Sequence, residues 1–186
     1  MARPEVMEFL LTRRSRPAKL LRGPGPDRAA LEPMLRAASR IPDHGKLEPW
    51  RFIVLGETAS RSFAEAVRAR AEAAGKDPDK GALAFEQAPV TVAVVGCPRP
   101  SDKIPDIEQT LSAGAACLSL LNAALASGWG ASWLTGWAAY DRPLLENALG
   151  LTANEWIAGF IHIGTETTTP PERPRPDIER IVDWRA

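Results

Sequence analysis

Apolar residues recur at helical spacing in several stretches of the chain. In the first of them, Val6, Phe9 and Leu10 fall on one side of the predicted helix. Asp27 is a favourable N-cap for the second helix, which must end before Pro42 because the residue preceding a proline disfavours helical backbone. The helices expected from this pattern cover residues 4–14, 28–41, 58–74, 80–87, 107–127 and 142–149, the third of them capped by Thr58.

Shorter runs rich in β-branched and aromatic residues predict strands. Val90–Val95 is a continuous apolar run, which is typical of a central strand buried on both faces. Gly164 is expected to end the last strand. The strands predicted in this way cover residues 50–55, 90–95, 129–134 and 156–163. Helices that precede, separate and follow a small number of strands indicate a three-layer sandwich of the α+β or α/β class.

The predicted helix over residues 107–127 carries no charge from Thr110 to Ser127, on any face. A helix that is exposed on one side normally carries polar residues there, so both sides of this helix must be covered. Either the rest of the chain covers it completely, or a second subunit covers part of it, and the pattern favours neither. The apolar part is too short and too rich in small side chains for a convincing membrane span.

The chain has 186 residues, the size of one domain, and residues 167–186 form a proline-rich tail that should be extended. Its 23 basic and 23 acidic side chains cancel, which argues against binding to nucleic acid or to an anionic membrane. An anionic ligand therefore needs a local cluster of arginines. Two cysteines without a CxxC motif, and an N-terminus without the apolar core of a signal peptide, favour the cytoplasm.

Motifs of several common enzyme classes are missing from the sequence. There is no GxGxxG between a strand and a helix, no P-loop, no GxSxG and no HExxH. His44 and His162 are the only histidines, so few side chains are available for acid–base or metal chemistry. This composition favours a cofactor that brings its own chemistry, and no metal site is expected.

Two basic segments are candidates for a binding site. Arg13-Arg14-Ser15-Arg16 ends the first helix and offers forked donors for a phosphate, although a basic helix end also complements the helix dipole without any ligand. Residues 40–50 include Arg40, Asp43 and His44. They form either a functional loop or a rigid turn in which the Asp43 side chain bonds to the backbone.

A third candidate, Gly128–Gly136, surrounds Trp133 with small residues. Glycine lets backbone amides approach a flat ligand closely, and main-chain donors and acceptors suit the edge of a flavin ring. The commoner meaning of such a run is a glycine-rich turn whose tryptophan fills the core. Glu108-Gln109, before the long helix, predicts only a solvated helix start.

Taken in order, these segments resemble the nitroreductase family of FMN-dependent flavoproteins. The matching segments are Arg13-Arg14-Ser15, Arg40–Phe52, Glu108–Trp133 and Gly159–Gly164. Each segment alone is a weak signal, but their order and spacing together are specific. The likeness extends from Glu8 to about Thr165 and is greatest to the short NAD(P)H nitroreductase subgroup.

The resemblance implies an α+β fold, namely a three-layer α/β/α sandwich with a small, mostly antiparallel sheet and a long central helix. It also implies a homodimer with FMN at the subunit interface, and NAD(P)H as the electron donor. The whole chain, residues 1–186, would be one FMN-binding domain. The residues implied to bind the cofactor are Arg13, Arg14, Ser15, Trp133, Leu134 and Thr135 of one subunit, with Arg40 and His44 of the other.

The sequence departs from the family's pattern at two positions. Glu48 stands where the family usually has glutamine, and Leu134 stands where the subgroup carries a basic residue. Binding of the FMN phosphate is therefore expected to depend on other arginines, such as Arg173 or Arg175 of the tail.

The function implied is ping-pong transfer of hydride at flavin N5, from NAD(P)H to a nitro compound, a quinone or a related small acceptor. No catalytic side chain is required, and a nearby arginine would stabilise the charge of the reduced ring. Two alternatives stay open. One is a flavoprotein of the same fold with a different reaction, such as dehalogenation or flavin degradation, and the other is a non-catalytic dimer that binds another phosphate ligand.

Overall fold

An antiparallel sheet forms the middle layer of the computed structural model, which describes residues 2–185. β3 lies between β2 and β5, while β1 and β4 also pair with β5. Every pairing is antiparallel. The strands are β1 (Leu21–Arg22), β2 (Trp50–Leu55), β3 (Val90–Gly96), β4 (Gly130–Leu134) and β5 (Trp156–Glu166).

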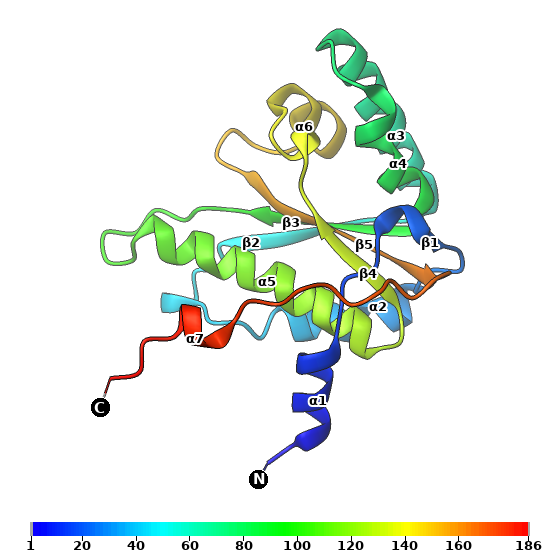
Figure 1. Cartoon of the computed structure of the whole chain (residues 1–186). Helices are drawn as coiled ribbons and strands as arrows, with labels where there is room; N and C mark the ends of the chain where they lie inside the picture. The colour runs from blue at the N-terminus through cyan, green and yellow to red at the C-terminus, as the bar shows by residue number, and fades with distance from the viewer. Residues whose placement is uncertain (1, 186) are drawn as a thin grey trace.

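Helices cover both faces of the sheet (Figure 1). The helices are α1 (Pro4–Thr12), α2 (Arg28–Ala38), α3 (Glu57–Ala73), α4 (Pro78–Gln87), α5 (Asp106–Ala126), α6 (Arg142–Leu149) and α7 (Ile178–Ile181). α5 and α2 lie on one face, and α3, α4 and α6 lie on the other (Figure 1). The predicted three-layer α+β sandwich with an antiparallel sheet and a long central helix is therefore confirmed.

The alternation of side chains along β3 creates two separate cores. Val92 and Val94 pack into the core under α5 and α2, whereas Ala93 and Val95 pack into the core under α3, α4 and α6. All seven residues of β3 are buried, as the continuous apolar run predicted. The second core also contains Phe85, whose ring meets those of Phe63 and Phe160 edge-on, at centroid distances of 4.8 and 4.9 Å.

Most of the predicted elements are present, with differences at their ends. β2 and α6 have the predicted bounds, and Gly150 ends α6 in the left-handed conformation, at φ 65°. α2 stops at Ala38 rather than 41, and the Ser39 hydroxyl then donates back to the carbonyl of Leu35. Ile41 still packs against the core, but from a loop.

Two further boundaries were predicted wrongly. α3 begins at Glu57 with Gly56 as its N-cap, so Thr58 does not cap it. Gly164 does not end β5, because the short strand β1 pairs with residues 165–166 and continues the ladder. A strand of two residues carries too little apolar pattern to be recognised in the sequence.

α5 has one face against the sheet and another that the chain leaves open. Its inner residues, such as Cys117 and Leu120, are fully buried, whereas Ile107, Leu111 and Leu118 are 61, 65 and 46% exposed. By length and hydropathy alone α5 is comparable to a membrane span. Its extensive packing against β3, β4, β5 and α2 identifies it as a core helix instead.

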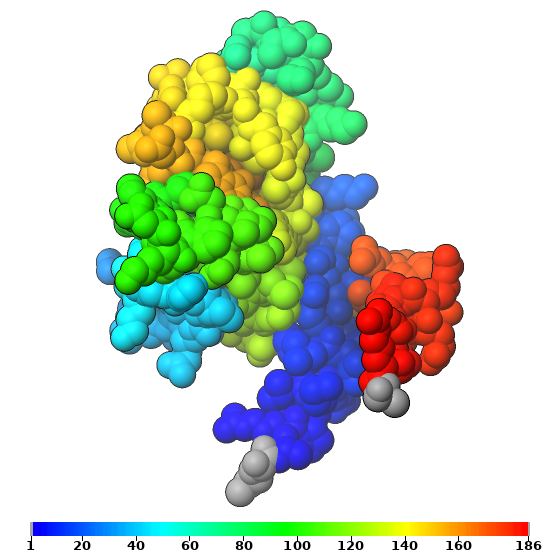
Figure 2. Space-filling model, turned by 90° about the vertical axis from the view of Figure 1, so that its left-hand side faces the viewer, coloured from blue at the N-terminus to red at the C-terminus, as the bar shows by residue number. Residues whose placement is uncertain are grey.

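α1 and the C-terminal tail project from the body of the protein (Figure 2). None of the residues of α1 is buried, and Met7, Leu10 and Leu11 are 55, 48 and 75% exposed. A soluble protein rarely leaves so much apolar surface open over neighbouring elements. Within residues 2–185, α1 therefore has little packing of its own to stabilise it.

His162 is fully buried on the side of β5 that faces α4. Its Nδ1 lies 3.0 Å from Thr91 Oγ1, on the neighbouring strand. Burial lowers the pKa of His162 from 6.5 to about 3. In the folded protein the His162 imidazole therefore stays neutral at pH values at which the same side chain is protonated in the unfolded chain.

We expect the free energy of unfolding to decrease as the pH falls from about 6.5 towards about 3. The unfolded state gains a proton at His162 in this range and the folded state does not. Proton uptake therefore favours the unfolded state, and the full free energy of unfolding is present only above this range. One such group contributes at most about 1.4 kcal/mol per pH unit. Urea unfolding across the range should show a shallower pH dependence in His162→Gln.

Thr58→Ala is a control, because Thr58 is exposed and its side chain does not titrate in this range, so the change should leave the pH dependence of unfolding unchanged. Parallel pH profiles for the wild type and His162→Gln would show that the buried imidazole does not cause the loss of stability.

Candidate functional site

Residues 13–16 leave α1 in extended conformation and lie against the outer edge of β4. The backbone N–H of Arg16 donates to the carbonyl of Ala131, at 2.7 Å. The Arg13 guanidinium donates to Ser15 Oγ at 3.2 Å, so these two predicted residues contact each other. The N-terminal segment is thereby fixed to the strand that carries Trp133.

The C-terminal tail passes beside the same N-terminal segment. Arg14 Nε donates to the carbonyl of Pro171, and Thr167 Oγ1 donates to the carbonyl of Leu20, both at 2.7 Å. Residues 167–176 form no helix or strand, as predicted for the proline-rich tail, but the prediction of an extended tail to residue 186 was wrong at α7, where residues 178–181 form a short helix. These two hydrogen bonds connect the chain's first and last segments.

Arg13, Arg16, Arg173 and Arg175 form an arginine cluster. Burial lowers the pKa of Arg13, and the charges of Arg175, Arg173 and Arg16 lower it further. Nε of Arg13 is buried and has no hydrogen-bond partner among residues 2–185. A group of cations with an unpaired buried donor suits an anion that has several oxygens, such as a phosphate.

Two carboxylates accompany the arginine cluster. Glu166 accepts from Arg16 Nε at 2.6 Å, and Glu172 accepts from Arg175 Nε at 2.8 Å. Neither forms an ion pair with Arg13 in the described part of the chain. The tail arginines were suggested by the sequence, but Glu166 was not, because its contact with Arg16 depends on how the strands pair.

Trp133 is anchored to the sheet by a β-bulge. The pairing of β3 with β5 passes from Val94–Gly159 to Val95–Ile157, so Ala158 is an extra residue without a partner on β3. Its carbonyl accepts from Trp133 Nε1, at 3.2 Å. The indole lies over Gly159, where a Cβ would stand 1.9 Å from Trp133 Nε1, so only glycine fits there.

Leu134 and Thr135 follow at the end of β4. The Trp133 and Leu134 side chains are 36 and 41% exposed, which is unusual for large apolar residues in a sheet. The predicted aromatic segment is therefore available at the surface rather than filling the core. Arg13–Arg16 and Trp133–Thr135 are brought to the same strand by the fold.

The loop over residues 40–50 is held rigidly. Both carboxylate oxygens of Asp43 accept backbone N–H bonds, from Leu47 at 3.1 Å and from Glu48 at 2.9 Å. Ser112 of α5 accepts from Trp50 Nε1 at 3.0 Å and donates to a loop carbonyl at 2.7 Å. The predicted turn at Asp43 is thus confirmed.

This rigid loop has positive φ at three positions, two of which are not glycine and are therefore strained. Gly45, Lys46 and Glu48 all have positive φ, at 72, 55 and 48°. Positive φ costs free energy in lysine and glutamate, and such strain persists only where surrounding bonds determine the conformation. The strain favours a functional loop over a simple connector.

His44 lies at the start of α5. Its Nδ1 is 2.7 Å from Glu108 Oε2, and both residues line a small cavity of about 330 Å³ together with Leu111. Glu108 therefore positions a histidine, although the sequence indicated only a solvated helix start. Arg40 is exposed, and its side chain makes no hydrogen bond or ion pair within residues 2–185.

The two groups of predicted residues lie at opposite ends of α5. His44 contacts the first turn, whereas Arg13–Arg16 lie on β4, which begins after the last turn (Figure 1). A helix of 21 residues is about 30 Å long. One chain alone therefore does not bring Arg40 and His44 to the arginine cluster.

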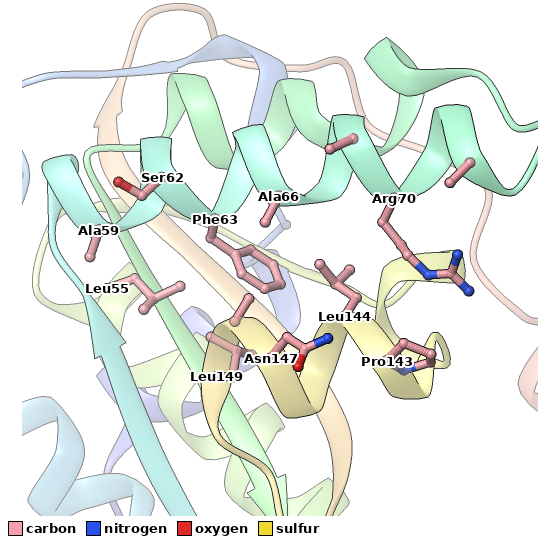
Figure 3. Close-up of a pocket in the computed structure, with 13 residues that line it drawn as sticks. Leu55, Ala59, Ser62, Phe63, Ala66, Arg70, Pro143, Leu144, Asn147 and Leu149 are labelled. Atoms are coloured by element: carbon pink, nitrogen blue, oxygen red, sulfur yellow. The ribbon is translucent and has the colours of Figure 1, made fainter.

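Another cavity lies elsewhere, between α3 and α6, and has a volume of about 810 Å³. Phe63 and Leu144 point into it, and Arg70 lies at one end (Figure 3). Arg70 already pairs with Asp141, at 2.9 Å, and the remaining walls are mainly alanine and leucine. This cavity contains none of the predicted site residues.

Neither cysteine provides a nucleophile. Burial raises the pKa of Cys117 to about 12. Burial, followed by a hydrogen bond to Glu155, raises the pKa of Cys97 to about 11. Both thiols therefore stay protonated at neutral pH. Only a thiolate is reactive, so neither cysteine is a nucleophile.

The sequence matches the model of the nitroreductase family over residues 10–165. A relative from Escherichia coli (strain K12), named "Putative NAD(P)H nitroreductase YdjA", is 35% identical over 164 residues. That alignment covers 87% of this chain and 88% of the relative.

Solved structures share the fold. The nitroreductase-like family protein from Bacillus cereus superposes with a TM-score of 0.79 at 22% identity, covering 99% of this chain and 97% of that one. An FMN-dependent nitroreductase from Clostridium difficile gives a TM-score of 0.72 at 18% identity, covering 96% and 98%. The match to the family model over residues 10–165 and the 35% identity to the Escherichia coli relative establish that the chain belongs to the nitroreductase family.

Proposed function

We propose that the protein is an FMN-dependent oxidoreductase that takes hydride from NAD(P)H and reduces a nitro compound, a quinone or a related small acceptor. Family membership supports this proposal, as do the NAD(P)H nitroreductase named among its relatives and the FMN-dependent nitroreductase that shares its fold. The whole chain would act as one FMN-binding domain in the cytoplasm, as a homodimer.

The arginine cluster is the observation that carries the proposal. Arg13, Arg173 and Arg175 would hold the FMN phosphate, because their charges already disfavour one another and Arg13 Nε has no partner among the described residues. A dianionic phosphate relieves this repulsion and accepts the free donors. Arg14, held by the tail, and Ser15, held by Arg13, would bind the remaining polar atoms of the cofactor.

The flavin ring would lie against Trp133, Leu134 and Thr135. These residues follow the part of β4 to which the N-terminal segment is attached, so the phosphate and ring sites are joined by one strand. Trp133 is fixed by the bulge at Ala158 rather than by loop contacts. A rigid indole provides a flat wall at little cost in conformational entropy.

A second subunit would complete the site. The outward stripe of α5 and the apolar side of α1 are exposed in one chain and need a cover. If the two-fold axis of the dimer is perpendicular to α5, the two copies of the helix run antiparallel, and the first turn of one lies beside the last turn of the other. This pairing would bring Arg40 and His44 of the partner subunit towards the arginine cluster.

When bound, FMN would supply the chemistry of hydride transfer between NAD(P)H and the acceptor, for which we expect ping-pong order. The chain's own residues bind the cofactor, orient it and stabilise the negative charge that reduction develops. An arginine beside the ring is suited to this last role, because charge interactions in a partly buried site are stronger than in water. No nucleophile or general acid is needed.

Purified protein should be yellow, and NADH or NADPH should bleach its visible absorbance under anaerobic conditions. Adding a nitroaromatic compound or a quinone afterwards should restore the colour. Absorbance spectra recorded after each addition measure both steps. A yellow protein that neither nicotinamide bleaches would refute the proposed electron donor, and a colourless protein that ignores added FMN would refute the cofactor.

Arg13→Ala and Arg175→Ala should each weaken FMN binding by roughly tenfold or more, because each removes a charged donor to the phosphate. Fluorescence titration of the apoprotein with FMN gives the dissociation constants. Arg61→Ala is the matched control, since Arg61 is exposed on α3 and pairs only with Glu57. An unchanged affinity in both cluster variants would remove the phosphate from this location.

At an FMN concentration that fills only intact sites, a mixture of Arg13→Ala and Arg40→Ala protein should be more active than either variant alone. In randomly formed dimers, roughly a quarter of all sites carry neither change if the two arginines come from different subunits. Reductase activity after joint refolding, compared with each variant refolded by itself, measures the recovery. No recovery in verified mixed dimers would place both arginines in one subunit's site.

A further inference from the structure

The small cavity of about 330 Å³ lies between the rigid loop over residues 40–50 and the first turns of α5. His44 lines it from the loop, while Glu108 and Ser112 line it from the helix. These two helix residues are four apart, so they are neighbours on one side of α5. The helix therefore presents two polar side chains to the loop at successive turns.

The backbone on both sides of His44 is fixed. The hydroxyl of Ser112 donates to the carbonyl of Pro42 at 2.7 Å, just before His44. Just after it, Gly45 lies against Ile104, where a Cβ would stand 2.4 Å from the Ile104 Cδ1 atom. Gly45 also has positive φ, a conformation in which any other residue would be strained. Only the rotation of its own side chain is then left to determine where the imidazole of His44 points.

Glu108 fixes this rotation. Nδ1 of His44 lies 2.7 Å from Oε2 of Glu108, and neither side chain forms another hydrogen bond or ion pair within residues 2–185. An ionised carboxylate only accepts, so Nδ1 carries a proton whether the imidazole is neutral or charged. The other ring nitrogen, Nε2, points away from Glu108 and is the one polar atom that His44 can still offer to a ligand.

The pair of His44 and Glu108 does little to stabilise the folded chain. In one subunit these two side chains are 62 and 44% exposed. A pair between exposed side chains contributes little to folding, because solvent screens the charges and both side chains lose conformational freedom. Leu111, part of the exposed outer stripe of α5, lines the same cavity. The pair therefore lies at the surface proposed for the second subunit.

We propose that Glu108 is a positioning residue for the cofactor, because it holds His44 so that Nε2 faces the FMN bound at the other subunit's arginine cluster. The proposal rests on the proposed function, which brings His44 to that cluster across the interface. Glu108 acts through the orientation of His44 and the proton on Nδ1, and not by contact with the cofactor. The first turn of α5 in one subunit thus helps to complete the site of the other.

Glu108→Met and Glu108→Gln separate the hydrogen bond from the charge. Both new side chains are neutral and close to glutamate in length, but only glutamine keeps an oxygen that accepts from Nδ1–H. We expect the dissociation constant for FMN to stay within about twofold of the wild type in Glu108→Gln and to rise roughly fivefold or more in Glu108→Met. Serial dilution of the holoprotein, followed by the fluorescence of released FMN, measures both constants. Equal affinities would overturn the proposal.

Two further variants control for charge and for the path through His44. Asp106→Asn removes a negative charge from the same turn of α5, and the Asp106 side chain forms no hydrogen bond or ion pair within residues 2–185, so the FMN affinity should not change. In a His44→Ala background, Glu108→Met and Glu108→Gln should bind FMN equally, because no imidazole is left to orient. A difference that persists without His44, or an equal loss in Asp106→Asn, would overturn the proposal.

The proton on Nδ1 provides a spectroscopic measurement that does not depend on affinity. The chain has only two histidines, so comparison with His162→Gln identifies the nitrogen signals of His44. Long-range proton–nitrogen correlation spectra of the labelled holoprotein should show a proton on Nδ1 of His44, and its occupancy should fall in Glu108→Met. An Nδ1 without a proton in the wild type would overturn the proposal.

Mixed dimers show which subunit Glu108 serves. At an FMN concentration that fills only intact sites, Glu108→Met mixed with Arg13→Ala should hold more FMN than either variant alone. Glu108→Met mixed with His44→Ala should show no such gain, because both changes affect the same half of the site. The opposite result in verified mixed dimers would overturn the proposal.

The same measurements separate this inference from the proposed function. A protein that binds no FMN overturns both. A wild-type dimer that holds FMN, with Glu108→Met binding it as tightly as Glu108→Gln, overturns this inference alone.

Discussion

The structure depends on a helix that must be covered on two sides. From Thr110 to Ser127 α5 carries no charge, and burial of its inner residues against the sheet holds the α2 and α5 layer in place. Its outer stripe, with Leu111 and Leu118, remains more than two-fifths exposed in one chain. Hydrophobic burial is roughly proportional to area, so this stripe is the strongest physical reason for a second subunit. The proposed cofactor site follows from it, because Arg40 and His44 meet the arginine cluster only across that interface.

Electrostatic repulsion gives the site its chemical preference. The chain has no net charge, yet its fold gathers Arg13, Arg16, Arg173 and Arg175 from both termini. Two carboxylates neutralise part of this charge and leave Arg13 Nε without a partner among the described residues. Repulsion within such a cluster destabilises the protein without a ligand, and binding of a dianion removes this repulsion.

Sequence patterns predicted the layers, the sheet and most helices, because apolar periodicity is a local property. These patterns failed where pairing between distant segments of the chain determines where a strand ends or how a side chain is held. β5 continues past Gly164 because β1 pairs with the next two residues, and Trp133 is held because a bulge frees the carbonyl of Ala158. The roles of the Arg13 and His44 segments came from a family resemblance, and their composition alone left a ligand-free explanation open. The link between His44 and Glu108 joins residues 64 apart, which no local pattern contains.

The meeting of both chain ends at one surface has a practical consequence. α1 and the C-terminal tail leave the body on the side that carries α5, and the tail is attached to the N-terminal segment through Arg14 and Thr167 (Figure 1). An affinity tag or fusion partner at either terminus would therefore be tethered close to the surface proposed for the second subunit. Material for biochemical study is best released from its tag, since a bulky extension would compete sterically with assembly.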